Sequence, residues 1–220
     1  LAQKGLGQDV DLEAGILLVM EFGYPDCDPD VCRQALDSLA HQLEQKLDLN
    51  ADPSQVVSTL THLLFQQEHF RGNKKNYLDP DNSYINKVLE NKTGLPITLS
   101  ILCVLVASRL SLPIVGVGLP GHYIAKYNHP KNPVYFDPFH QGRLLTRADC
   151  IQIMEQFGHP FEEIYLSQST HQETLIRMMN NLIQVYQGSN ETKKADTLSD
   201  YIKILMNPSK DPFSKNNREI

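Results

Sequence analysis

The strongest constraint on the fold is a change in hydrophobic period along the chain. Residues 96–110 carry apolar side chains on nearly all sides of a predicted helix, which is typical of a helix at the centre of a domain. Beyond this helix the period falls from 3.6 to 2, and strands are predicted over residues 113–119, 122–127, 134–137 and 143–145. A central helix packed on a small antiparallel sheet places the chain in the α+β class.

Helices are predicted on both sides of this core. Residues 9–70 show apolar side chains at helical spacing in three segments, and two of these begin with Asp-Pro pairs at Asp28 and Asp52. Two further apolar stripes follow residue 171 and predict a helical hairpin of about 34 residues, the length of one tetratricopeptide-type unit. We expect the hairpin to pack on the domain, because a single unit cannot bury its own apolar face.

These patterns predict three parts of the chain. The first is a domain over residues 1–165, which includes the helical part at about 9–70. The second is the tetratricopeptide-like hairpin over residues 166–208, and the third is a flexible polar tail over residues 209–220. Hydrophobic residues make up 41% of the 220, which is enough for a full core.

Composition narrows the function classes. The formal net charge of −6 disfavours nucleic acid as a partner, because phosphate binding needs a basic surface. No apolar run reaches 18 residues, so no membrane span is predicted. The first residues lack the apolar segment of a signal peptide, and a reducing, cytoplasmic location is expected unless a targeting segment precedes Leu1.

No metal site and no cofactor are predicted. The four cysteines match no zinc spacing and are too few for a disulfide scaffold. Asp79, Asp81, Asn82 and Ser83 place several oxygens close together, but the Gly and Glu of a calcium loop are absent. We expect these four residues to form a turn and to cap a short helix.

Five motifs occur in order along the chain. They are Phe70-Arg71-Gly72-Asn73, Tyr77-Leu78-Asp79-Pro80-Asp81-Asn82-Ser83-Tyr84, Gly94-Leu95-Pro96-Ile97-Thr98-Leu99-Ser100, Gly116-Val117-Gly118-Leu119-Pro120-Gly121-His122 and Asp137-Pro138-Phe139. The combination resembles the transglutaminase-like superfamily, in the branch of bacterial SirB-type proteins that is also found within certain F-box-only proteins. The resemblance covers roughly residues 9–206, including the tetratricopeptide-like tail.

This resemblance implies a papain-like core. In such enzymes a Cys at a helix N-terminus attacks an acyl carbon, a His on the adjacent strand acts as the base, and an Asp or Asn on the next strand orients the His. His122 matches the base and Asp137 matches the orienting acid. A hairpin of about 15 residues separates them, which suits neighbouring strands.

The nucleophile of the family has no counterpart in this chain. The position that matches the catalytic Cys is about Pro96, which carries no nucleophilic group. Thr98 and Ser100 lie in the first turn and are weaker candidates, because a hydroxyl needs a stronger base and an oxyanion hole. Capping the helix is the simpler role for them. Cys103 lies two turns into the helix, away from its N-terminus.

A cleft at His122 and Asp137 is expected to include Pro96, Tyr123, His140 and Asn82. We favour a non-catalytic protein-binding, peptide-binding or regulatory module. The alternative is a papain-like hydrolase or acyltransferase with a displaced nucleophile. In a third possibility His122 and Asp137 form a buried pair of structural purpose only. The identity of the partner and the oligomeric state cannot be derived from the sequence.

Overall fold

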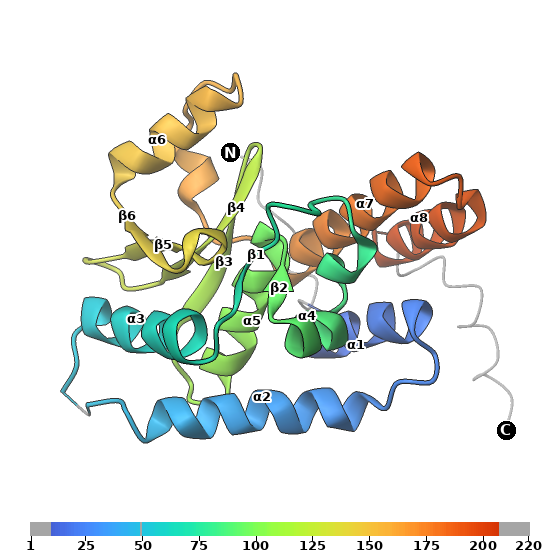
Figure 1. Ribbon diagram of the computed structural model, residues 1–220. Coiled ribbons are helices and arrows are strands. Elements are labelled where there is room, and N and C mark those ends of the chain that lie inside the picture. The colour runs from blue at the N-terminus through green and yellow to red at the C-terminus, as the bar shows by residue number, and fades with distance from the viewer. Residues whose placement is uncertain (1–9, 49, 207–220) are drawn as a thin grey trace, which may run out of the picture.

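The computed structural model describes residues 10–48 and 50–206, and the predicted tail at 209–220 lies outside this range. The chain has the predicted α+β fold, with a small antiparallel sheet among helices. Figure 1 shows helix α5 at the centre, with the sheet and α6 on one side and α7 and α8 on the other.

The N-terminal part is helical, as predicted. Helices α1 (Leu12–Gly23), α2 (Pro29–Glu44) and α3 (Pro53–Thr61) each begin after an Asp whose carboxylate accepts a first-turn N–H, namely Asp11, Asp28 and Asp52. Helix α3 continues as a π-helical turn, His62–Gln67. Helix α4 (Ile85–Asn91) lies between two short parallel strands, β1 (Arg71–Gly72) and β2 (Thr93–Gly94). The sequence analysis did not predict these two strands.

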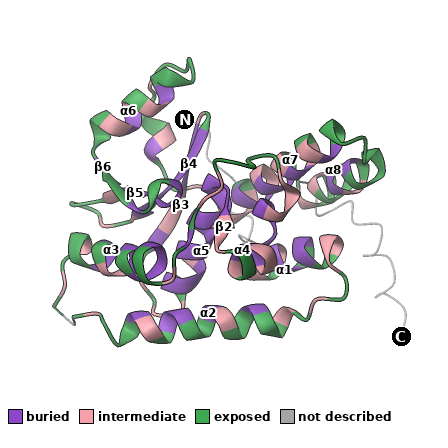
Figure 2. Ribbon diagram, viewed as in Figure 1, coloured by how far each residue is buried: buried purple, intermediate pink, exposed green. Residues whose placement is uncertain are grey.

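Helix α5 (Pro96–Ser108) is the buried centre of the molecule. Its side chains are buried on all faces from Pro96 to Ala107 except at Val104, and Figure 2 shows this helix and the adjacent strands as mostly buried. The sheet has the order β3 (Ile114–Leu119), β4 (His122–Tyr127), β5 (Val134–Asp137) and β6 (Arg143–Leu145), with every pair antiparallel.

The sheet is covered on both faces. Tyr123 and Ala125 of β4 belong to the main core around α5, whereas Ile124 between them belongs to a second cluster. The second cluster includes Cys150 and Met154 of α6 (Arg147–Gln156), which covers that face. Because side chains alternate along a strand, β4 is buried on both sides and is the rigid centre of the sheet.

The C-terminal hairpin packs on the rest of the chain. It consists of α7 (His171–Gly188) and α8 (Thr192–Met206), and it follows a short 3-10 helix, Glu163–Leu166. Leu175, Met178 and Leu182 of α7 are buried in the same core as α1 and α5. None of the described helices is long and apolar enough to span a membrane.

Candidate functional site

His122 and Asp137 are hydrogen-bonded, as their positions on neighbouring strands predict. His122 is the first residue of β4 and Asp137 is the last of β5. The distance from Nε2 of His122 to Oδ2 of Asp137 is 2.8 Å, and both residues are buried. This contact uses Nε2 and leaves Nδ1 of His122 outside the pair.

Asp137 is held by the turn that follows it. Its Oδ1 accepts the backbone N–H groups of Phe139 (3.0 Å) and His140 (3.3 Å) at the start of the 3-10 turn Pro138–His140. Its Oδ2 also contacts Nδ1 of His140 at 2.7 Å. Burial pushes the pKa of Asp137 up, but the hydrogen bonds and charges of His122 and His140 outweigh burial, so this pKa lies below its ordinary value.

The backbone of His122 is fixed from the C-terminal hairpin. Arg177 of α7 donates from its guanidinium to the carbonyl oxygen of His122 at 2.8 Å and lies over the ring of Tyr123. Burial lowers the pKa of Arg177, and the nearby Tyr123 and Tyr77 oppose that shift. The hairpin therefore contributes directly to the position of the candidate base.

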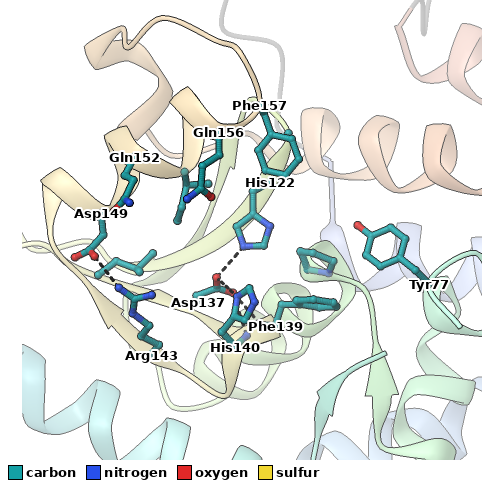
Figure 3. Close-up of a pocket in the computed structure, with 14 residues that line it drawn as sticks. Tyr77, His122, Asp137, Phe139, His140, Arg143, Asp149, Gln152, Gln156 and Phe157 are labelled. Atoms are coloured by element: carbon teal, nitrogen blue, oxygen red, sulfur yellow. Dashed lines mark hydrogen bonds and ion pairs between the residues drawn. The ribbon is translucent and has the colours of Figure 1, made fainter. Parts of the chain in front are cut away.

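A cavity of about 640 Å³ opens in front of the His122–Asp137 pair. Figure 3 shows the pair together with His140, with Phe157 and Tyr77 at the sides of the cavity and α6 across from it. The lining residues are Tyr77, Pro96, Gly121, His122, Asp137, Phe139, His140, Arg143, Leu145, Asp149, Gln152, Ile153, Gln156 and Phe157. Of the predicted cleft residues, Pro96 and His140 line this cavity.

Pro96, the residue that the resemblance matches to the catalytic Cys, begins α5 and lines this cavity. The weaker candidates are directed elsewhere: Oγ1 of Thr98 donates to the carbonyl of Asn82 at 2.6 Å and accepts from the N–H of Leu95 at 2.9 Å. Oγ of Ser100 donates to the carbonyl of Pro96 at 2.8 Å. Both hydroxyls are buried and shape the start of α5, and neither residue lines the cavity.

None of the four cysteines offers a thiol to the cavity. All four are free thiols, and Cys103 is fully buried in α5, where burial raises its pKa. Burial also raises the pKa of Cys150 to about 11. Within the described part of the chain, no Cys, Ser or Thr side chain lines the cavity.

Asn82 and Tyr123, the other two predicted cleft residues, lie behind the cavity. The Asn82 amide donates to the carbonyl of Asn76 at 2.7 Å and accepts from Asn73 at 2.9 Å, so it organises the loop that carries Tyr77. The Tyr123 hydroxyl bonds to Oγ1 of Thr174 at 2.8 Å, on the opposite side of β4. Both residues support the site without facing the cavity.

Helix α6 forms one wall of the cavity, which the sequence analysis did not predict. Gln152 and Gln156 are four residues apart and face the cavity from one side of that helix, while Phe157 follows at its C-terminal end. The four-residue spacing of the two amides was the available signal. Tyr77 was part of a motif, but nothing in its local pattern indicated that it lines the cavity.

Three relatives illustrate what the chain is similar to. A UPF0162 protein of Xylella fastidiosa (strain 9a5c) is 29% identical over 90% of this chain and 73% of its own length. A UPF0162 protein of Pseudomonas aeruginosa is 29% identical over 81% of this chain and 66% of its own length. F-box only protein 21 of Mus musculus is 27% identical over 70% of this chain, which is 25% of that protein.

No solved structure was found to match the chain. A family profile described as the transglutaminase-like superfamily matches residues 30–180, which include α5, the sheet and the His122–Asp137 pair. This range is more than half of the chain and carries all the predicted triad positions. The chain therefore belongs to the transglutaminase-like superfamily.

Proposed function

We propose that this protein is a non-catalytic transglutaminase-like module that binds a protein segment or peptide in the cavity in front of His122. One observation carries the proposal. Among the described residues, the cavity is lined by His122 and Asp137, which the resemblance matches to the base and the orienting acid. It is also lined by Pro96 at the position matched to the nucleophile, and by no Cys, Ser or Thr. The acyl transfer of papain-like enzymes uses an attacking group of that kind.

The lining suits an extended peptide. Phe157 and Tyr77 expose 55% and 47% of their surfaces at the sides of the cavity, so their rings are free to pack on apolar side chains. The amides of Gln152 and Gln156 and the imidazoles of His122 and His140 provide hydrogen-bonding groups elsewhere on the cavity wall. Apolar anchors around a few convergent polar groups are typical of ligand sites.

The similarity to F-box only protein 21 supports a role as a module. The matched region is a quarter of that protein, so a transglutaminase-like part occurs there together with additional chain. A fold that supports catalysis in one protein can serve another role in a second protein.

A phage-displayed random peptide library selected on the immobilised protein tests the proposal, with all steps in EDTA. The enriched peptides are then titrated by fluorescence polarisation against the wild type and two variants. Phe157→Ala should weaken binding at least about tenfold, as expected for an aromatic anchor. Leu18→Ala is the control, since Leu18 is also an exposed apolar residue but lies on α1, outside the cavity.

Two results would contradict the proposal. One is a selection that enriches no peptide. The other is a set of enriched peptides that bind Phe157→Ala as tightly as the wild type.

A further inference from the structure

A second histidine approaches the carboxylate that orients His122. Nε2 of His122 and Nδ1 of His140 lie 2.8 and 2.7 Å from the same oxygen, Oδ2 of Asp137. The three atoms all lie within 4.8 Å of one another. Orienting a base requires one carboxylate and one imidazole, so the role of His140 is not explained by the family's chemistry.

The three atoms are of the types that bind zinc, and they lie close together. Zinc binds imidazole nitrogen at about 2.0–2.1 Å and carboxylate oxygen at about 2.0–2.2 Å, which places tetrahedral ligand atoms about 3.3 Å apart. The two nitrogen–oxygen distances, 2.8 and 2.7 Å, are hydrogen-bond lengths about 0.5 Å shorter than this, so an ion that replaces the hydrogen bonds would widen them, and the three ligand atoms lie within 4.8 Å of one another. Because 46% of the His140 side chain is exposed, small rotations of its ring can adjust these distances.

The surroundings orient these groups before any ion arrives. The second oxygen of Asp137, Oδ1, is held by the N–H groups of Phe139 and His140, and the backbone of His122 is held by Arg177. Hydrogen bonds of this kind to ligating carboxylates tune metal affinity. The three groups also border the 640 Å³ cavity, which leaves room for a further ligand.

We propose that His122, Asp137 and His140 form a binding site for a divalent transition-metal ion of the zinc class, with one coordination position open to the cavity. Two imidazoles and one carboxylate favour such ions over calcium and magnesium, which prefer oxygen ligands alone. Each imidazole keeps its one proton on the nitrogen that faces away from the ion. The open position accepts water, or a carbonyl or carboxylate oxygen of a peptide in the cavity.

Metal titration of the whole chain tests this site directly. Protein treated with EDTA and then dialysed is titrated with Zn²⁺ by calorimetry and with Co²⁺ by absorption spectroscopy. The expected result is one ion per chain and Co²⁺ d–d bands without a thiolate charge-transfer band, because none of the three ligands is a cysteine. The four free thiols elsewhere in the chain would produce that band if they bound the ion.

Variants locate the ion. His140→Ala should weaken Zn²⁺ binding by more than about tenfold, since removing a ligand costs at least as much as removing a residue that orients one. His140 is half-exposed, so the variant is expected to fold. His41→Ala is the matched control, because His41 lies on α2 and is exposed. His122→Gln, with its fold checked by circular dichroism, should repeat the loss.

The proposal is overturned if the wild type binds no stoichiometric ion, if a thiolate band appears, or if His140→Ala and His122→Gln bind Zn²⁺ like the wild type. The last result would leave the cluster as a hydrogen-bonded structural group. This inference does not rest on peptide binding. The titration contains no peptide and the peptide selection is done in EDTA, so failure of one leaves the other standing.

Discussion

At the scale of single residues, the site depends on Asp137. This buried carboxylate joins two imidazoles to two backbone N–H groups, so both of its oxygens are fully used. Because the turn Pro138–His140 begins at Asp137, the same side chain both ends β5 and places His140 beside His122. Asp137 therefore determines both the local fold of the turn and the positions of the two imidazoles.

Asp137→Asn should destabilise the fold by about 1–3 kcal/mol at neutral pH, since an amide NH₂ must face a donor on one side or the other. The exposed Asp200→Asn, which breaks only the pair with Lys203, should change stability by no more than about 0.5 kcal/mol. Urea unfolding followed by circular dichroism measures both. An Asp137→Asn variant as stable as the wild type would contradict the described hydrogen bonds.

The pH dependence of this difference has a definite sign. The folded-state pKa of Asp137 lies below its ordinary value, so the carboxylate stabilises the fold above the unfolded-state pKa of about 3.9. The contribution is lost as the pH falls through the folded-state value. The difference in the free energy of unfolding between the wild type and Asp137→Asn should therefore become smaller in acid.

At the scale of elements, the helices and the sheet were predictable because their signals are local. The change of period after α5 gave all four strands of the sheet, and the Asp-Pro pairs gave the starts of α2 and α3. The short pair of β1 and β2 escaped prediction, because two residues carry no periodicity. The start of α5 at Pro96 was predictable too, since its motif is local.

The cavity itself was only partly predictable. The motifs of the sequence contain or adjoin four of the lining residues, His122, Asp137, Pro96 and His140. Helix α6, in contrast, lines the cavity because it packs on the face of the sheet that is turned away from α5. Gly121 illustrates the difference: its φ of +77° suits the turn between β3 and β4, and a Cβ there would clash with the Phe157 ring. The glycine allows the turn to be predicted from the sequence, but the contact with Phe157 cannot be predicted in that way.

At the scale of the whole molecule, the predicted boundary near residue 165 crosses a continuous core. Met178 and Leu182 of α7 pack with residues of α1 and α5, and Arg177 reaches across to β4. The hydroxyls of Tyr84 and Tyr186 meet at 2.6 Å and tie α7 to the loop before α4. We therefore expect the hairpin and the domain to unfold together.

Leu182→Ala should lower the free energy of unfolding by about 2–5 kcal/mol, because it removes a fully buried side chain from this core. The loss should appear as one cooperative transition in urea. Amide hydrogen exchange should rise in β4 as well as in α7. Two separate transitions, with β4 still protected, would show that the hairpin folds as an independent unit.

The central claim is that the cavity retains the base and the orienting acid without an attacking side chain. Peptide mapping of covalent adducts, after exposure to thiol-directed iodoacetamide and a serine-directed fluorophosphonate, tests it most directly. Pro96→Cys is the positive control, since it places a thiol at the helix start in the same cavity as His122. The account predicts His122-dependent labelling of that variant and no His122-dependent adduct in the wild type. An adduct on wild-type Thr98, Ser100 or Cys103 that disappears in His122→Ala would contradict it.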